Sequence, residues 1–136
     1  MNRLSAFLHP VSETEEKEVI ISNRFVDEKG NPIPFKIRAL KQEENDAIVK
    51  RCHRTRKGPN GQLQDFVDPT ELTRQIIVAA TVDPDFRSAE VCDHFGVADP
   101  AMVPGKMLLA GEFSKLSQAI MELSGFSEDL TEQAKN

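Results

Sequence analysis

Residues 18–40, EVIISNRFVDEKGNPIPFKIRAL, carry the pattern that decides the predicted fold. Two β-rich runs, EVIISNRFV and PIPFKIRAL, are separated by DEKGN, whose glycine and asparagine can adopt the positive φ of a tight turn. In the second run Ile33, Phe35 and Ile37 alternate with polar residues or proline, which gives a strand one apolar face. The stretch therefore predicts an antiparallel β-hairpin over residues 18–40.

The surroundings of this hairpin are constrained by two physical facts. Pro34 has no N–H to donate to a ladder, so the second strand lies at a sheet edge or its first residues stay unpaired. A two-stranded hairpin alone is only marginally stable in water. The hairpin must therefore pack on helices, pair with further strands, or join a neighbouring chain.

The rest of the chain is predicted to be mainly helical over residues 41–126. DPTELTRQIIVAATV begins with the capping Asp68, and GEFSKLSQAIMELSG ends at a glycine suited to a helix stop. The second of these helices has an apolar stripe of Phe113, Leu116, Ile120 and Leu123. A further helix is expected from Lys41 to near Arg54.

Short elements and termini complete the expected organisation. Short helices are predicted over residues 3–8 and 88–96 and after Asp99, and the region 1–17 is interpreted as a short helix and linker. Residues 127–136 are expected to form a tail. The prediction is one α+β domain over residues 1–136, with an N-terminal antiparallel β-hairpin packed on a mainly helical C-terminal part.

Composition argues for a soluble protein that contacts other proteins. The 136 residues carry a net charge of −5, which disfavours general attraction to a polyanion. Eight Phe but no Tyr or Trp indicate contacts through Phe and aliphatic residues, and Met102, Met107 and Met121 offer adaptable surface. No run approaches the ~20 apolar residues of a membrane span. Two cysteines fit a reduced cytosolic setting.

Metal binding and catalysis are disfavoured by residue spacing. Cys52 with His53, and Cys92 with His94, are the only thiol and imidazole groupings, and neither spacing allows chelation from a helix. Buried structural thiols are the simpler interpretation. No nucleophile with a separate base and no phosphate-binding glycine loop is visible. We expect no metal, no cofactor and no enzymatic activity.

The basic stretch KRCHRTRK, residues 50–57, allows two interpretations. Arg51, Arg54 and Arg56 could contact phosphates or an acidic partner. Alternatively, Lys50, Arg51 and Arg54 occupy the last turn of the preceding helix, where cations offset the negative end of the helix dipole. No aromatic residue lies within the run to stack on a base, so specific nucleic-acid binding is not expected.

Several segments resemble, in order, the XkdN-like family of phage tail assembly chaperones, known from PBSX-type prophages and related long-tailed phages. They are NRFVDEKGNPIPFKIRAL, IIVAATVDPDF, CDHFGV, KMLLAGEFSKLSQAIMELSGF and EQAKN, and together they cover about residues 22–136. One departure is Ala110, where the family commonly has proline before a Gly-Glu pair. This departure affects only the shape of one turn.

The resemblance implies a non-enzymatic assembly factor that acts in the bacterial host cytoplasm and is absent from the mature virion. Such chaperones coat the tape measure protein until tail tube subunits polymerise, so the expected partner is the tape measure protein. The tail tube protein and further copies of this chain are additional candidate partners. Alternatives are a DNA-binding phage regulator that uses residues 50–57, and a minor structural tail protein. The candidate partner-binding residues are Phe25, Ile33, Phe35, Ile37, Phe113, Leu116, Ile120, Leu123, Arg51, Arg54 and Arg56.

Overall fold

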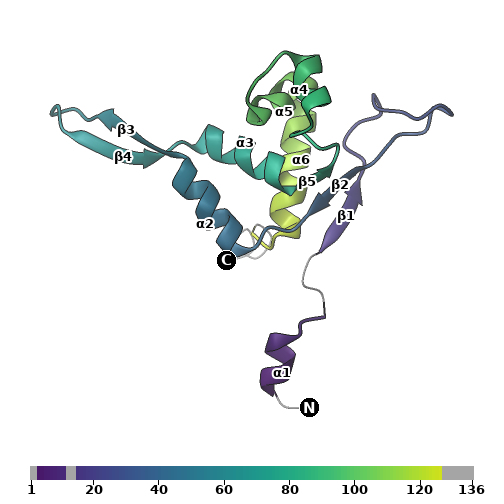
Figure 1. The fold of residues 1–136 in the computed structure, drawn as a ribbon, viewed down its shortest axis with the longest axis horizontal. Helices are drawn as coiled ribbons and strands as arrows, with labels where there is room; N and C mark the ends of the chain where they lie inside the picture. The colour runs from purple at the N-terminus through teal and green to yellow at the C-terminus, as the bar shows by residue number, and fades with distance from the viewer. Residues whose placement is uncertain (1–2, 12–14, 127–136) are drawn as a thin grey trace, which may run out of the picture.

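The computed structural model describes residues 3–11 and 15–126, and it has the predicted α+β architecture (Figure 1). Its helices are α1 (Arg3–Leu8), α2 (Gln42–Arg51), α3 (Pro69–Ala80), α4 (Ala89–Phe95), α5 (Val103–Met107) and α6 (Ala110–Leu123), with a 3₁₀ turn η1 (Pro100–Met102). Its strands are β1 (Glu16–Val19), β2 (Phe35–Arg38), β3 (His53–Lys57), β4 (Leu63–Val67) and β5 (Thr81–Asp83). The N-terminal hairpin β1–β2 and the mainly helical remainder are confirmed.

The hairpin is part of a three-stranded antiparallel sheet with the order β1-β2-β5. Glu16 pairs with Arg38 and Val19 with Phe35, while the other edge of β2 pairs with β5. The strand after Pro34 is therefore central and does not lie at a sheet edge. The proline lies just before the first paired residue of this strand, so its missing N–H interrupts no pairing. The third strand explains how a marginal hairpin becomes stable.

The connection between β1 and β2 is longer than the sequence pattern predicted. Residues 20–34 lie outside both strands, and within them residues 26–32 form a separate turn closed by an isolated bridge between Val26 and Pro32. At its tip the Asp27 carboxylate accepts hydrogen bonds from the N–H groups of Lys29 and Asn31, at 2.8 and 3.0 Å. Gly30 has a φ of 83°, which favours glycine. The turn extends away from the sheet (Figure 1).

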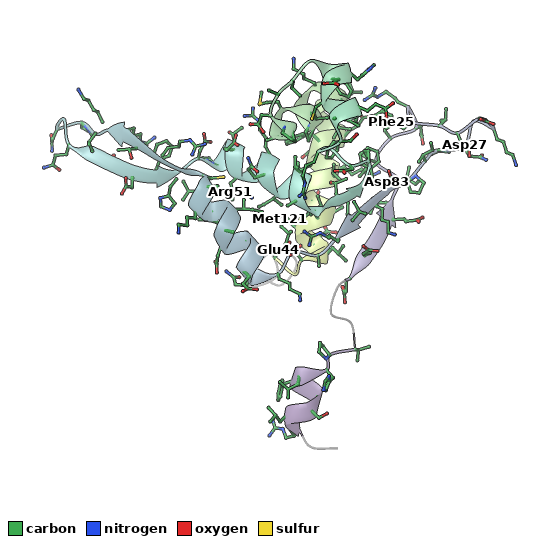
Figure 2. All side chains as sticks on the ribbon, viewed as in Figure 1. Phe25, Asp27, Glu44, Arg51, Asp83 and Met121 are labelled. Atoms are coloured by element: carbon green, nitrogen blue, oxygen red, sulfur yellow. The ribbon has the colours of Figure 1, made fainter. Side chains whose placement is uncertain are left out.

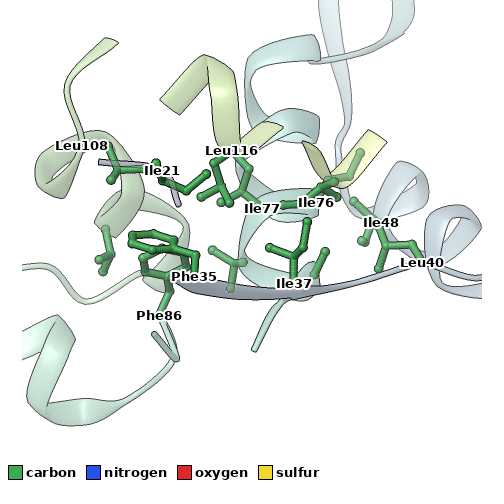
Figure 3. Close-up of a cluster of buried hydrophobic side chains, with 14 of the residues drawn as sticks. Ile21, Phe35, Ile37, Leu40, Ile48, Ile76, Ile77, Phe86, Leu108 and Leu116 are labelled. Carbon is green, nitrogen blue, oxygen red and sulfur yellow. The ribbon is translucent and has the colours of Figure 1, made fainter. Parts of the chain in front are cut away.

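The core lies between the sheet and the helices α3 and α6 (Figure 3). Phe35 and Ile37 point into it from β2 because alternate strand residues share a face. Ile77 of α3 and Leu116 of α6 are fully buried there. The two long helices begin and end largely as predicted, since Asp68 caps α3 through the N–H groups of residues 70 and 71, and α6 stops before Gly125, whose φ is 89°.

The helix expected from Lys41 to near Arg54 is shorter than predicted, and its predicted end is wrong. Helix α2 ends at Arg51, and Cys52 turns the chain into β3, which pairs with β4 over five residue pairs from His53–Val67 to Lys57–Leu63. Residues 58–62 form the turn of this second hairpin. The region 41–126 thus contains three strands besides its helices. Alternating polar and cationic residues of β3 lack an apolar face, so they gave no strand signal.

The remaining short elements follow their sequence signals. Helix α4 follows Ser88 and stops at Gly96 in the left-handed conformation, with a φ of 67°. Asp99 caps η1 by accepting from the N–H of Ala101 at 3.0 Å. Helix α1 forms within residues 3–8 and buries none of its residues. The predicted tail, residues 127–136, lies outside the described residues. Within the described part, no helix is long and apolar enough to cross a membrane.

Candidate functional site

An apolar hollow of about 180 Å³ lies where the β1–β2 connection meets the end of β5 and the end of α5. Its lining residues are Phe25, Ile33, Pro34, Phe35, Asp83, Pro84 and Met107. We call it the apolar hollow. Asp83 is its one ionisable residue, so the walls offer contact surface for an apolar side chain rather than a pair of groups for acid-base chemistry.

Local backbone contacts hold the two sides of the apolar hollow together. The N–H of Ile33 donates to the carbonyl of Phe25 at 2.8 Å, which places these two residues opposite each other at the base of the extended turn. The rings of Phe25 and Phe35 lie 5.7 Å apart between centroids and are tilted by 45°. This spacing is within the range of favourable aromatic pairs. Ile33 remains 43% exposed, so a partner can reach it.

Arg24 fastens this region to the helical part. Its Nε donates to Oε2 of Glu112 at 3.0 Å, and Nη2 contacts Oε1 of the same carboxylate. Nη2 also donates to the carbonyl of Met107 at 3.2 Å, and the guanidinium lies 4.9 Å from the centroid of the Phe25 ring. Arg24 thereby connects two walls of the apolar hollow, one from the turn and one from α5. Figure 2 shows Phe25 at the start of this turn and Asp27 near its tip.

Glu112 is the second half of this connection. Its Oε1 also accepts from the N–H of Leu109 at 2.8 Å, at the start of α6. Hydrogen bonds from Arg24 and then Ser22, together with the Leu109 bond and the Arg24 charge, lower the pKa of Glu112 to about 2 despite some desolvation. The carboxylate is therefore ionised at neutral pH and joins the turn to the helix.

The predicted contact residues divide into exposed and buried positions. Phe25, Ile33 and Phe35 all line the apolar hollow, and Ile33 is the most accessible of the three. Ile37, Leu116 and Ile120 are fully buried in the core, and Phe113 and Leu123 pack against it while partly exposed. The apolar stripe of α6 therefore packs mainly in the core.

The basic stretch 50–57 is split between two elements. Arg51 is the last residue of α2, whereas Arg54 and Arg56 lie on the same face of β3. Arg56 stacks its guanidinium 4.5 Å from the centroid of the Phe66 ring. Arg54 donates from Nη1 to the carbonyl oxygens of Arg51 and His53, both at 2.9 Å. Arg54 thus still binds the carboxyl end of α2, although from a strand.

The two cysteines are structural. Cys52 and Cys92 are both buried and unbonded to each other. Burial raises the pKa of the Cys52 thiol, with a smaller contribution from the Glu71 charge. Cys92 Sγ lies 3.4 Å from the carbonyl of Phe86. Among residues 3–11 and 15–126, no three His, Cys, Asp or Glu side chains gather closely enough to hold a metal ion.

Comparison with known proteins identifies the family. The model of the family described as Phage XkdN-like tail assembly chaperone protein matches residues 4–136. The chain belongs to this family. The resemblance seen in the ordered sequence segments is therefore confirmed. Membership supports a role in phage tail assembly through protein partners in the tail, and favours a role without catalysis.

Two relatives from Bacillus subtilis (strain 168) extend over most of this family member. The chain is 37% identical over 130 residues to the Phage-like element PBSX protein XkdN, and 35% identical over 130 residues to the uncharacterized protein YqbN. Each match covers 91% of this chain and 86% of the relative. The crystal structure of the protein YqbN superposes with a TM-score of 0.78 at 29% identity, covering 93% of this chain and 99% of the other.

Sequence patterns had indicated part of the apolar hollow but not its whole lining. Met107 was expected to offer adaptable surface, and the phenylalanines of the hairpin were candidates. Pro84, Arg24 and Glu112 were not candidates. Arg24 and Glu112 are 88 positions apart in the chain, so no periodicity of one element could have indicated their contact.

Proposed function

We propose that this chain is a non-enzymatic chaperone that binds the phage tape measure protein and keeps it soluble until tail tube subunits polymerise around it. Membership of the XkdN-like family supports the role in assembly. The observation that carries the finer proposal is the apolar hollow, whose accessible Ile33 and Met107 can receive apolar side chains of a helix-rich client. The expected site of action is the bacterial host cytoplasm, before the virion is complete.

The geometry favours binding over catalysis. An enzyme of this size would need a nucleophile, a base or a metal held together in a cleft. The apolar hollow brings one carboxylate, Asp83, together with Phe, Ile, Pro and Met side chains. Contact with the tail tube protein during hand-over of the client, and association of several copies along one client, extend the same proposal.

Co-expression with the tape measure protein of the same phage tests the proposal. We expect the two proteins to co-purify, and the tape measure protein to remain in the soluble fraction only when the chaperone is present. Purified phage particles should lack the chaperone. A tape measure protein that is equally soluble without this chain, and that never co-purifies with it, would show that the proposal is wrong.

The particle analysis also separates the two alternatives considered from the sequence. A minor structural tail protein would remain in purified particles in a fixed ratio to the tail subunits. A DNA-binding regulator would be retained on DNA in a salt-dependent manner that requires the cations of residues 50–57. Neither behaviour is expected of the proposed chaperone.

A further inference from the structure

A second surface lies between α2, α3 and the segment that follows β5. Two adjoining hollows of about 140 and 210 Å³ share the lining residues Arg51, Ala79 and Arg87. We call the two hollows together the arginine groove. It is separate from the apolar hollow, with which it shares no lining residue.

Helical periodicity builds the walls of the arginine groove. The α2 wall consists of residues 44, 47, 48 and 51, a spacing of three and four that places them on one face of the helix. The α3 wall has the same spacing at residues 75, 78 and 79. Arg87 reaches the groove from the connection between β5 and α4, and Pro100 and Ala101 of η1 close one end. Figure 2 shows Glu44 and Arg51 on α2.

Some of the charged side chains in the arginine groove are paired with each other, and others are unpaired. Arg38 is held by both oxygens of Glu44, at 2.9 and 2.6 Å, so this pair neutralises itself. One carboxylate oxygen of Asp99 accepts a hydrogen bond from the N–H of Ala101. The side chains of Arg51 and Arg87 make no hydrogen bond or ion pair with any residue of the described part of the chain. Arg51 and Arg87 are thus exposed guanidinium groups that line one groove and pair with neither of its acids, Glu44 and Asp99.

The apolar floor narrows the choice of ligand. Ile48, Val78 and Ala101 line the groove beneath the arginines and are almost completely buried. A ligand that satisfies both features carries a carboxylate beside apolar groups, as an acidic residue on an amphipathic helix does. The one strand residue in the lining is Arg38 of β2, which pairs with a strand on each side, so an extended segment would gain no backbone pairing there.

A polyanion fits this groove less well than a single carboxylate. Asp99 lines one hollow beside the two arginines and would repel successive phosphates of a nucleic acid, whereas Glu44 in the other hollow is already paired with Arg38. Arginine pairs bind carboxylates through several directed N–H donors, which makes them selective for such a group.

We propose that the arginine groove binds an acidic side chain of an amphipathic helix in the client protein, with its carboxylate received by Arg51 and Arg87. The inference rests on the proposed function, because that function supplies the helical client. It adds a second, charge-selective contact to the apolar hollow. Chaperone binding then depends on salt through the arginine groove and on apolar side chains through the apolar hollow.

A synthetic peptide tests the groove without the client. The probe is an amphipathic helical peptide with a row of Glu beside a row of Leu, and its control has Gln in place of Glu. In NMR titrations we expect the Nε–Hε signals of Arg51 and Arg87 to shift with the Glu peptide and not with the Gln peptide. Equal responses to both peptides, or none, would overturn the inference.

Matched charge variants test the residues. The double variant R51Q/R87Q should weaken binding of the Glu peptide at least tenfold, with the unfolding temperature unchanged. The control K50Q/K57Q removes the same charge from exposed positions outside the groove, and it should change binding less than twofold. Equal losses of peptide binding in both variants would show that binding depends only on the net charge of the protein, and would overturn the inference. Tighter, arginine-dependent binding of duplex DNA than of the Glu peptide would assign the groove to phosphate and overturn it as well.

Co-expression with the tape measure protein separates this inference from the proposed function. If the wild-type chain retains the client and R51Q/R87Q retains it equally at every salt concentration, the groove inference is wrong and the chaperone function stands. If the wild-type chain never retains the client, the proposed function is wrong, and the peptide titration alone decides whether the groove binds a carboxylate.

Discussion

Arg24 and Glu112 join the β1–β2 turn to the first turn of α6 across 88 positions of sequence. The Nε of Arg24 lies 3.0 Å from Oε2 of Glu112, and the same guanidinium reaches the carbonyl of Met107. This contact holds the wall that carries Phe25 against the wall that carries Met107. The shape of the apolar hollow therefore depends on an ion pair that lies outside it.

The pH dependence of stability should report this ion pair. Because the pKa of Glu112 is lowered from 4.5 to about 2, its stabilising contribution is complete above about pH 4.5 and is lost as the pH falls toward 2. Glu112→Gln should lower the unfolding temperature at pH 7, and its difference from the wild type should shrink between pH 4.5 and 2. Thermal unfolding of both proteins between pH 2 and 7 measures this difference in unfolding temperature. A constant difference would show that the ion pair is not responsible.

The exposed side of the apolar hollow should control client binding. Ile33→Asp places a charge on a half-exposed position, so we expect loss of co-purification with the tape measure protein and an unfolding temperature close to that of the wild type. Leu63→Asp is the matched control, because Leu63 is 73% exposed on the β3–β4 hairpin. Equal effects of the two changes would contradict a role for the apolar hollow.

Any side chain at Gly96, where α4 ends, should destabilise the fold. Its φ of 67° is strained for other residues, so Gly96→Ala should destabilise the fold by about 1–2 kcal/mol. Gly111→Ala offers the opposite case. Gly111 lies within α6, its φ is not positive and the space that a methyl group would occupy is open, so alanine should stabilise by about 0.5–1 kcal/mol. Chemical denaturation of both variants tests whether the backbone conformation of the glycine decides the sign of the change in the free energy of unfolding.

Two helix starts that look alike in sequence should respond differently to alanine. Asp68 accepts hydrogen bonds from the N–H groups of Thr70 and Glu71 at 3.0 and 3.2 Å, so Asp68→Ala should cost about 0.5–2 kcal/mol. Ser88 occupies the same position before α4 but makes no such bond. Ser88→Ala should therefore cost clearly less. Comparable losses, measured by urea denaturation, would mean that the cap bond contributes little.

The buried hydroxyl of Thr81 should be dispensable. Thr81 is 4% exposed in β5, and its Oγ1 has no hydrogen-bond partner among the described residues. Thr81→Val replaces this hydroxyl by a methyl group of similar size, so we expect stabilisation by about 1 kcal/mol. Thr55→Val is the control, because the Thr55 hydroxyl donates to Asp65 at 3.2 Å on the surface. A lower unfolding free energy of Thr81→Val would show that the hydroxyl is satisfied in solution.

Local signals in the sequence were sufficient for several elements. The alternation around Phe35 and Ile37 and the cap at Asp68 act within a few residues, so β2 and the start of α3 were predicted correctly. The order of several segments was sufficient for the family. The candidates Phe25, Ile33 and Phe35 were also found this way, because each lies in the β-rich stretch that the pattern singles out.

Tertiary contacts decided what local patterns could not. The pairing of β5 with β2 makes the hairpin a three-stranded sheet, and the cationic stretch after Arg51 becomes a strand only because β4 pairs with it. The apolar hollow and the arginine groove each combine residues from separate elements. The sequence by itself determined the long helices α3 and α6, the strand around Phe35 and Ile37, and the family, since these depend on short-range propensity and order. Only the tertiary structure brought Arg24 to Glu112 and Arg51 to Arg87, because contacts between distant segments leave no periodic trace along the chain.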